Sequence, residues 1–142
     1  MHGLGRMHRI VRAVRAVPRA EDFQFFNGLP TAEMTAPAYR GIGAELYSSA
    51  VFAFAPEIAL AFHRALAEDD KALAETLLEE FYGPLVRLRD EVPGYSVSLI
   101  KAGVTLRGLD VGSVRAPLLD PTPEHTARLA KLIDHGLEVV GA

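Results

Sequence analysis

The chain carries three lysines, the side chains that can form a Schiff base with a carbonyl substrate. Burial in apolar surroundings lowers the pKa of an ammonium group and makes it nucleophilic. Lys101 stands among apolar neighbours, in the run Leu99-Ile100-Lys101-Ala102, and Lys71 and Lys131 also fall on expected helices. A helix lysine commonly lays its stem on apolar surface and keeps its charge in water. We therefore interpret Lys101 as a surface helix residue rather than a nucleophile.

The other side chains that could do chemistry form no recognisable catalytic pattern. Without cysteine the chain has no thiolate nucleophile, zinc–cysteine site or disulfide framework. No histidine pair has the i, i+4 spacing of a zinc helix, and no glycine-rich loop of the phosphate-binding type is present. The acidic runs at 68–70 and 79–80 are typical of a solvated surface.

Two polar stretches remain, and each follows an apolar run typical of a buried strand. The first is Asn27-Gly28-Leu29-Pro30-Thr31, and the second is Ser48-Ser49. In parallel βα folds, ligands bind outside the carboxyl ends of the strands. Gly28 would allow a ligand to approach the backbone, and Ser48 offers a hydroxyl donor and acceptor. The alternative interpretation, a turn glycine and serines that satisfy backbone groups, has equal support from spacing.

The elements that must position these stretches alternate in the first third of the chain. Hydrophobic periodicity predicts a helix over 4–17, a buried strand over 23–26, a helix over 31–40 and a second buried strand over 46–51. Helices are then expected over 56–67, 71–90 with a kink at Gly83-Pro84, 95–106, and 122–137, with a loop at 107–121. Thr31 and Thr122 are the expected N-caps of their helices.

Two buried parallel strands do not make a stable sheet by themselves, because parallel sheets are covered on both faces and contain more strands. The chain is therefore either a helical protein with a small insert or part of a larger βα array. The apolar, non-alternating strands favour the array, so we predict an α/β fold.

Composition limits the class of protein. The chain has 142 residues, 49% of them hydrophobic, which suffices for one domain with a core. A net charge of −3 argues against nucleic-acid binding. No stretch is long enough to span a membrane, and we expect a cytoplasmic protein. A basic amphipathic start at residues 1–16 leaves open a presequence or a membrane-surface helix.

Four ordered motifs together resemble the 5-dehydro-4-deoxyglucarate dehydratases of the dihydrodipicolinate synthase and N-acetylneuraminate lyase superfamily. They occupy 27–33 (NGLPTAE), 47–52 (YSSAVF), 94–103 (GYSVSLIKAG) and 114–118 (VRAPL). The resemblance covers the chain in order and corresponds to the C-terminal half of that family's polypeptide.

The resemblance implies a (β/α)8 barrel followed by a three-helix C-terminal extension. Residues 1–67 would be the closing part of the barrel, from helix six to helix eight, with strands seven and eight at 23–26 and 45–49. Residues 68–142 would be the helical extension. Such a barrel needs about 250 residues, so the chain would hold about half of one.

The family's reaction removes water and carbon dioxide from 5-dehydro-4-deoxy-D-glucarate through a Schiff base on a strand-six lysine. The resemblance places that lysine before Gly3, so no residue of this chain is expected to be the nucleophile. Gly28, Ser48 and Ser49 match the family's substrate-binding positions. Asn27 and Ala53 depart from its usual glycine and asparagine, which leaves the substrate's identity open. No cofactor or metal is implied.

These observations lead to three hypotheses. The chain is the C-terminal portion of such a dehydratase, inactive alone because the Schiff-base lysine is absent. It is a non-enzymatic assembly module whose strand edge pairs with a separate N-terminal half or with a second copy. It is part of a related aldolase that cleaves 2-keto-3-deoxy sugar acids.

Overall fold

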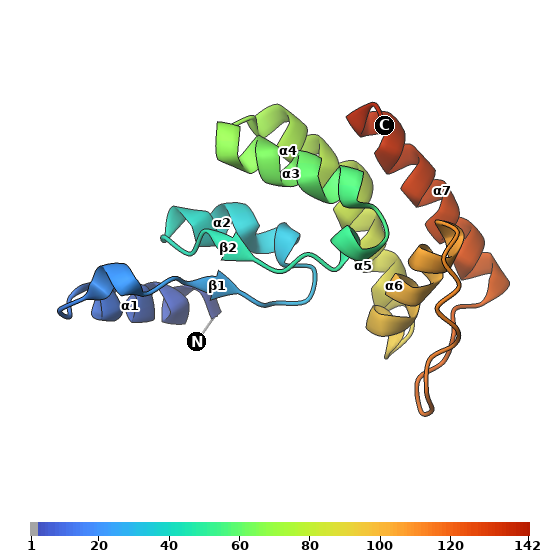
Figure 1. Ribbon diagram of the computed structural model, residues 1–142, viewed down its shortest axis with the longest axis horizontal. Coiled ribbons are helices and arrows are strands. Elements are labelled where there is room, and N and C mark those ends of the chain that lie inside the picture. The colour runs from blue at the N-terminus through green and yellow to red at the C-terminus, as the bar shows by residue number, and fades with distance from the viewer. Residues whose placement is uncertain (1–2) are drawn as a thin grey trace. The chain divides into compact units, whose positions relative to one another are not determined.

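The computed structural model describes residues 3–142, which form two compact units divided between Ser48 and Ser49 (Figure 1). The resemblance predicts a different boundary, after residue 67, because it separates the barrel portion from the C-terminal extension. That boundary stays a prediction. Because each unit is compact by itself, the two are described in turn.

The first unit holds a parallel pair of short strands with helices between and before them. Its elements are α1 (Gly3–Arg15), η1 (Ala20–Asp22), β1 (Phe26–Asn27), η2 (Ala32–Thr35), α2 (Ala36–Gly41) and β2 (Leu46–Tyr47). Phe26 lies opposite Leu46, and Asn27 lies opposite Tyr47. The parallel pairing predicted from the alternation of elements is confirmed.

The predicted extent and burial of the strands are wrong. The two strands are each two residues long rather than 23–26 and 46–51, and Phe26 and Leu46 are 55% and 44% exposed. In a closed barrel, side chains from several strands fill the interior in layers. The sheet of the described residues has two strands, so these apolar side chains have few neighbours.

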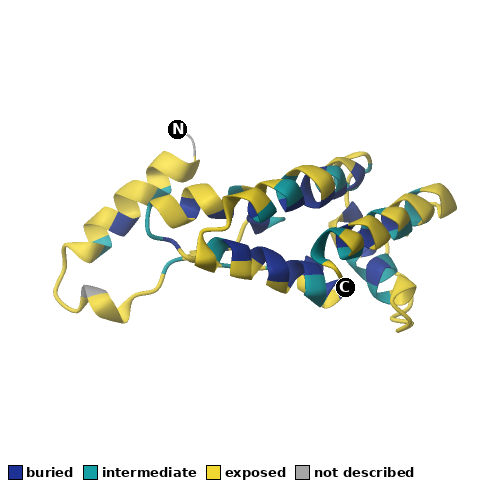
Figure 2. Cartoon of the chain, turned by 90° about the horizontal axis from the view of Figure 1, so that it is seen from above, coloured by how far each residue is buried: buried dark blue, intermediate teal, exposed yellow. Residues whose placement is uncertain are grey.

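The first helix is amphipathic, as predicted, but it ends at Arg15 rather than at 17. Pro18 disfavours helical backbone at the residue before it, so the chain turns away early. In Figure 2 the helix beside the N-terminus is exposed over nearly its whole length, and Val11 is its buried residue. The helix predicted over 31–40 begins as the 3₁₀ turn η2, and Thr31 has left-handed backbone, so its hydroxyl makes no capping hydrogen bond.

The second unit is helical and contains most of the core. It comprises η3 (Val51–Ala53), α3 (Pro56–Glu68), α4 (Lys71–Leu77), the π-helical turn η4 (Leu78–Tyr82), α5 (Gly83–Asp90), α6 (Tyr95–Leu106) and α7 (Pro123–Val140). Helix α7 packs against α3, α5, α6 and η4. The second unit contains a cluster of three aromatic side chains, Phe62, Phe81 and Tyr82, each 0% exposed.

Glycine allows α7 to lie close to its neighbours. A Cβ atom on Gly136 would lie 2.6 Å from Ile58 Cδ1 and 2.6 Å from Phe81 Cδ2, well inside normal contact distance. Gly103 on α6 has the same role, since its Cβ would lie 2.7 Å from the ring of Phe54. The helix packing of this unit therefore depends on residues that have no side chain.

The single helix expected over 71–90 is three helical segments. A kink was predicted at Gly83-Pro84, and the irregularity lies just before it, in η4. A proline within a helix lacks an N–H donor, and its ring clashes with the carbonyl four residues earlier. That carbonyl belongs to Glu80, inside η4, and the wider π turn changes the spacing there.

The start of α7 and the loop before it match the expectation. The Thr122 hydroxyl accepts a hydrogen bond from the His125 backbone N–H at 3.2 Å, and Pro123 occupies the first turn. The helix ends at Val140 rather than at 137. Among residues 3–142, no helix has the length and apolar character needed to cross a membrane.

Candidate active-site edge

The structure brings Gly28 and Ser48 together at the carboxyl ends of the two strands. The Ser48 backbone N–H donates to the Asn27 carbonyl oxygen at 3.1 Å, which continues the β1–β2 pairing by one residue. Side chains two residues apart along a strand point to the same face of a sheet. Gly28 and Ser48 therefore continue the exposed face that carries Phe26 and Leu46.

The fold itself does not require glycine at position 28. Gly28 does not have a positive φ, and a Cβ atom there would meet only the Phe26 ring, at 3.6 Å and 3.7 Å. Both distances are ordinary van der Waals contacts, so alanine would fit. Glycine leaves open space on the exposed face at this position. A bound ligand would use that space, whereas a turn does not need it.

Ser49 is the first residue of the second unit. Its hydroxyl oxygen accepts a hydrogen bond from the Phe52 backbone N–H at 3.2 Å, at the start of η3. This contact agrees with the alternative interpretation, in which a serine satisfies backbone groups. Substrate binding by Gly28, Ser48 and Ser49 stays a prediction.

The sequence placed Asn27 in the first polar stretch and as a departure from a family pattern, but it did not predict the structural role of its side chain. Its side chain is buried, with 2% exposure. The carboxamide oxygen accepts from the Leu29 N–H at 3.2 Å, and the carboxamide nitrogen donates to the Ala32 carbonyl at 3.3 Å and the Thr35 hydroxyl at 2.9 Å. Asparagine readily hydrogen-bonds the backbone two residues ahead, so the Asn-Gly pair itself carried a signal for this turn.

A buried acid lies close to the same edge. Glu33, in η2, is 1% exposed. Partial burial, together with the negative charge of Glu33, raises the pKa of Tyr47 to about 12. The Tyr47 phenol is therefore protonated at neutral pH and can donate a hydrogen bond.

Lys101 lies on α6 in the second unit. Its ammonium group donates to the Ser113 carbonyl at 2.6 Å, which ties α6 to the loop that follows it. In the same loop, the Asp120 carboxylate accepts a hydrogen bond from the Val114 N–H at 3.1 Å. This hydrogen bond and a second one from the Ser113 side chain lower the pKa of the Asp120 carboxyl. The interpretation of Lys101 as a residue without a nucleophilic role stays a prediction.

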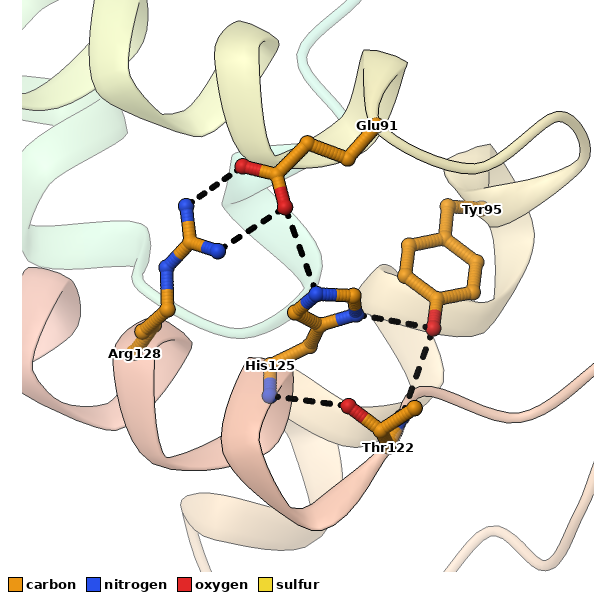
Figure 3. A network of polar contacts seen from close by, with 5 residues as sticks. All are labelled: Glu91, Tyr95, Thr122, His125 and Arg128. Carbon is orange, nitrogen blue, oxygen red and sulfur yellow. Dashed lines mark hydrogen bonds and ion pairs between the residues drawn. The ribbon is translucent and has the colours of Figure 1, made fainter.

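A second polar cluster joins the start of α7 to the end of α5 and the start of α6 (Figure 3). The Tyr95 hydroxyl accepts from the Thr122 N–H at 3.3 Å and lies 3.0 Å from His125 Nδ1, while His125 Nε2 lies 3.2 Å from Glu91. Arg128 holds both oxygens of Glu91, at 2.8 Å and 2.5 Å. These contacts hold the start of α7 against the end of α5 and the start of α6, so the cluster serves as a clasp between helices.

Comparisons with known proteins agree with this geometry. Residues 2–136 match the model of the dihydrodipicolinate synthetase family. A "Probable 5-dehydro-4-deoxyglucarate dehydratase" of Streptomyces griseus is 62% identical over 95% of the chain and 42% of its own length. A "Probable 5-dehydro-4-deoxyglucarate dehydratase 1" of Streptomyces coelicolor is 57% identical over 96% of the chain and 43% of its own length. The chain thus spans less than half of the length of these relatives.

Solved structures show the same fold. The crystal structure of dihydrodipicolinate synthase from Oceanobacillus iheyensis superposes with a TM-score of 0.73 at 28% identity, covering 91% of this chain and 42% of that one. The corresponding enzyme structure from Bacillus clausii gives a TM-score of 0.77 at 24% identity, covering 95% and 44%. A mostly helical chain with one parallel strand pair is consistent with part of a barrel. The matched family model, which spans nearly the whole chain, establishes that this chain belongs to the dihydrodipicolinate synthetase family.

Proposed function

We propose that the chain forms the closing part of a hydro-lyase barrel that converts 5-dehydro-4-deoxy-D-glucarate into 2,5-dioxopentanoate, water and carbon dioxide. The observation that carries the proposal is the hydrogen bond from the Ser48 N–H to the carbonyl of Asn27, which precedes Gly28, at the carboxyl edge of two parallel strands, where βα barrels place their active sites. The names of the relatives at 62% and 57% identity support this substrate. The cytoplasmic location expected from the sequence belongs to the same proposal.

Within that reaction, the residues of this chain bind and orient the substrate. A Schiff base to the 2-keto group, formed by a lysine outside this chain, supplies the electron sink for loss of water and carbon dioxide. Gly28 leaves room for the substrate at the edge of the sheet, and the Ser48 and Ser49 hydroxyls can hydrogen-bond its oxygens. This division of roles assigns no catalytic residue to the chain itself.

The exposed face of the sheet supports the need for a second part. Phe26 and Leu46 are paired in register, and both are about half exposed on the face that a complete barrel would fill with side chains from other strands. The proposal therefore includes a complementing N-terminal half, a barrel portion at 1–67, and a three-helix extension within 68–142. Alone, the chain is expected to be inactive.

Reconstitution tests this function directly. The chain is co-expressed with the part of the Streptomyces griseus relative that precedes the matched region, and formation of 2,5-dioxopentanoate is measured. We expect turnover from the complex and none from either part alone. A complex in which Lys101→Met replaces this chain's only lysine on α6 should keep its turnover, since Lys101 is not the nucleophile. A stable complex without turnover, or turnover by the isolated chain, would overturn the proposal.

A further inference from the structure

We propose that Asn27 is a positioning residue that fixes the loop of residues 28–31 in the shape that presents Gly28 beside Ser48. The inference rests on the proposed function for the meaning of that loop. The loop-holding role itself rests on contacts within the first unit and can be tested separately.

The carboxamide of Asn27 holds the loop at both ends. Its oxygen accepts from Leu29 N–H at 3.2 Å, one residue after Gly28, and its nitrogen donates to the carbonyl of Ala32 at 3.3 Å, one residue after the loop ends. The same nitrogen donates to Thr35 Oγ1 at 2.9 Å, and that hydroxyl in turn donates to the Ala32 carbonyl at 3.2 Å. One buried side chain therefore links β1, the loop and η2.

The loop adopts a conformation that needs such support. Thr31 has φ 48° and ψ 60°, in the left-handed region. A β-branched residue rarely adopts this backbone conformation, and it persists only where the surrounding structure imposes it. The hydrogen bonds of Asn27 bracket Thr31 on both sides, so they supply the restraint.

The pairing of the strands transmits this arrangement to Ser48. The Asn27 carbonyl accepts the Ser48 N–H at 3.1 Å, while its side chain holds the loop that carries Gly28. A single residue thus sets the relative position of the two groups that we place against the substrate. Loss of the carboxamide should weaken substrate binding more than it slows the chemical step, because Asn27 acts through the loop.

The composition of the chain allows a direct measurement of the holding role. It contains one asparagine, Asn27, and one glutamine, Gln24, so a ¹⁵N-labelled sample has two pairs of side-chain amide signals. Gln24 is exposed and serves as the internal reference. We expect the Asn27 amide protons to exchange with water at least about tenfold more slowly than those of Gln24, because the carboxamide nitrogen is buried and donates to the buried Ala32 carbonyl and the half-buried Thr35 hydroxyl. Thr35→Val, which removes one acceptor while keeping the side-chain shape, should lower that protection.

The positioning role is tested in the reconstituted complex. Asn27→Asp keeps the acceptor for Leu29 N–H and removes both donors, so we expect KM for 5-dehydro-4-deoxy-D-glucarate to rise about tenfold while kcat changes less than about threefold. Exchange of the Asn27 amide as fast as that of Gln24 would overturn the holding role. A protected amide with an unchanged KM in Asn27→Asp would overturn the positioning role alone. A complex of the unsubstituted chain without turnover would overturn the proposed function, and the positioning role with it, while the exchange result would still decide whether Asn27 holds the loop.

Discussion

Replacing Gly136 with alanine tests the close packing of α7 against α3 and η4. The new Cβ would lie 2.6 Å from Ile58 Cδ1 and 2.6 Å from Phe81 Cδ2, about 1 Å short of a normal carbon–carbon contact. Both neighbouring side chains are 0% exposed, so neither has free space to enter. Overpacking of this kind costs about 1–3 kcal/mol, whereas alanine gains about 1 kcal/mol over glycine in a helix. We expect a net loss of about 1 kcal/mol.

Urea denaturation followed by circular dichroism measures this change as a shift in midpoint, with the slope unchanged. Gly5→Ala is the matched control, because Gly5 lies within α1 and nothing is within 4 Å of its Cβ position. The control should stabilise the first unit by up to about 1 kcal/mol, since only the propensity gain applies. If Gly136→Ala proves as stabilising as Gly5→Ala, the packing argument for α7 is wrong.

Three further outcomes are expected. Gly28→Ala should leave stability unchanged or raise it by about 0.4–1 kcal/mol, because the backbone accepts alanine. The same substitution should raise KM in the reconstituted complex, and an unchanged KM would show that Gly28 is not part of the binding edge. Hydrogen bonding to Arg128 lowers the pKa of Glu91 below its usual 4.5, so the stability it contributes is present above pH 4.5 and is lost as pH falls through the lowered value. Glu91→Gln should therefore flatten the acid limb of a pH–stability curve, and an unchanged limb would count against the clasp. Leu129→Ala should cost about 2–5 kcal/mol by thermal unfolding, because Leu129 is 0% exposed; a loss well under 1 kcal/mol would show that the core collapses around the site.

Local chemistry made much of the fold predictable. Helical periodicity placed α3, α6 and α7 within a few residues, and the Thr122-Pro123 start of α7 was identified from capping rules alone. The alternation of helices and short apolar runs predicted a parallel strand pair, which the structure has. These features depend on neighbours only a few positions apart, so a single sequence contains the information.

The candidate edge was predictable only in outline. The sequence placed Gly28 and Ser48 after strands, and parallel pairing then brings them together. It did not show that Asn27 would be buried, because its hydrogen-bond partners lie in the loop and in η2, whose placement depends on the left-handed turn at Thr31. Strand burial was misjudged for a related reason, since exposure depends on which other strands are present to cover a face.

By itself, then, the sequence determined where most helices lie to within a few residues, that two strands run in parallel, and which polar groups follow them, since all of these depend on short-range backbone preference and hydrophobic period. The tertiary structure alone decided which glycines are structural and which leave space. Gly136 is crowded at its Cβ position, whereas Gly28 has only ordinary contacts there. The atoms that crowd Gly136 belong to Ile58 and Phe81, which are distant in the chain, and packing distances between such residues cannot be predicted from a local sequence pattern.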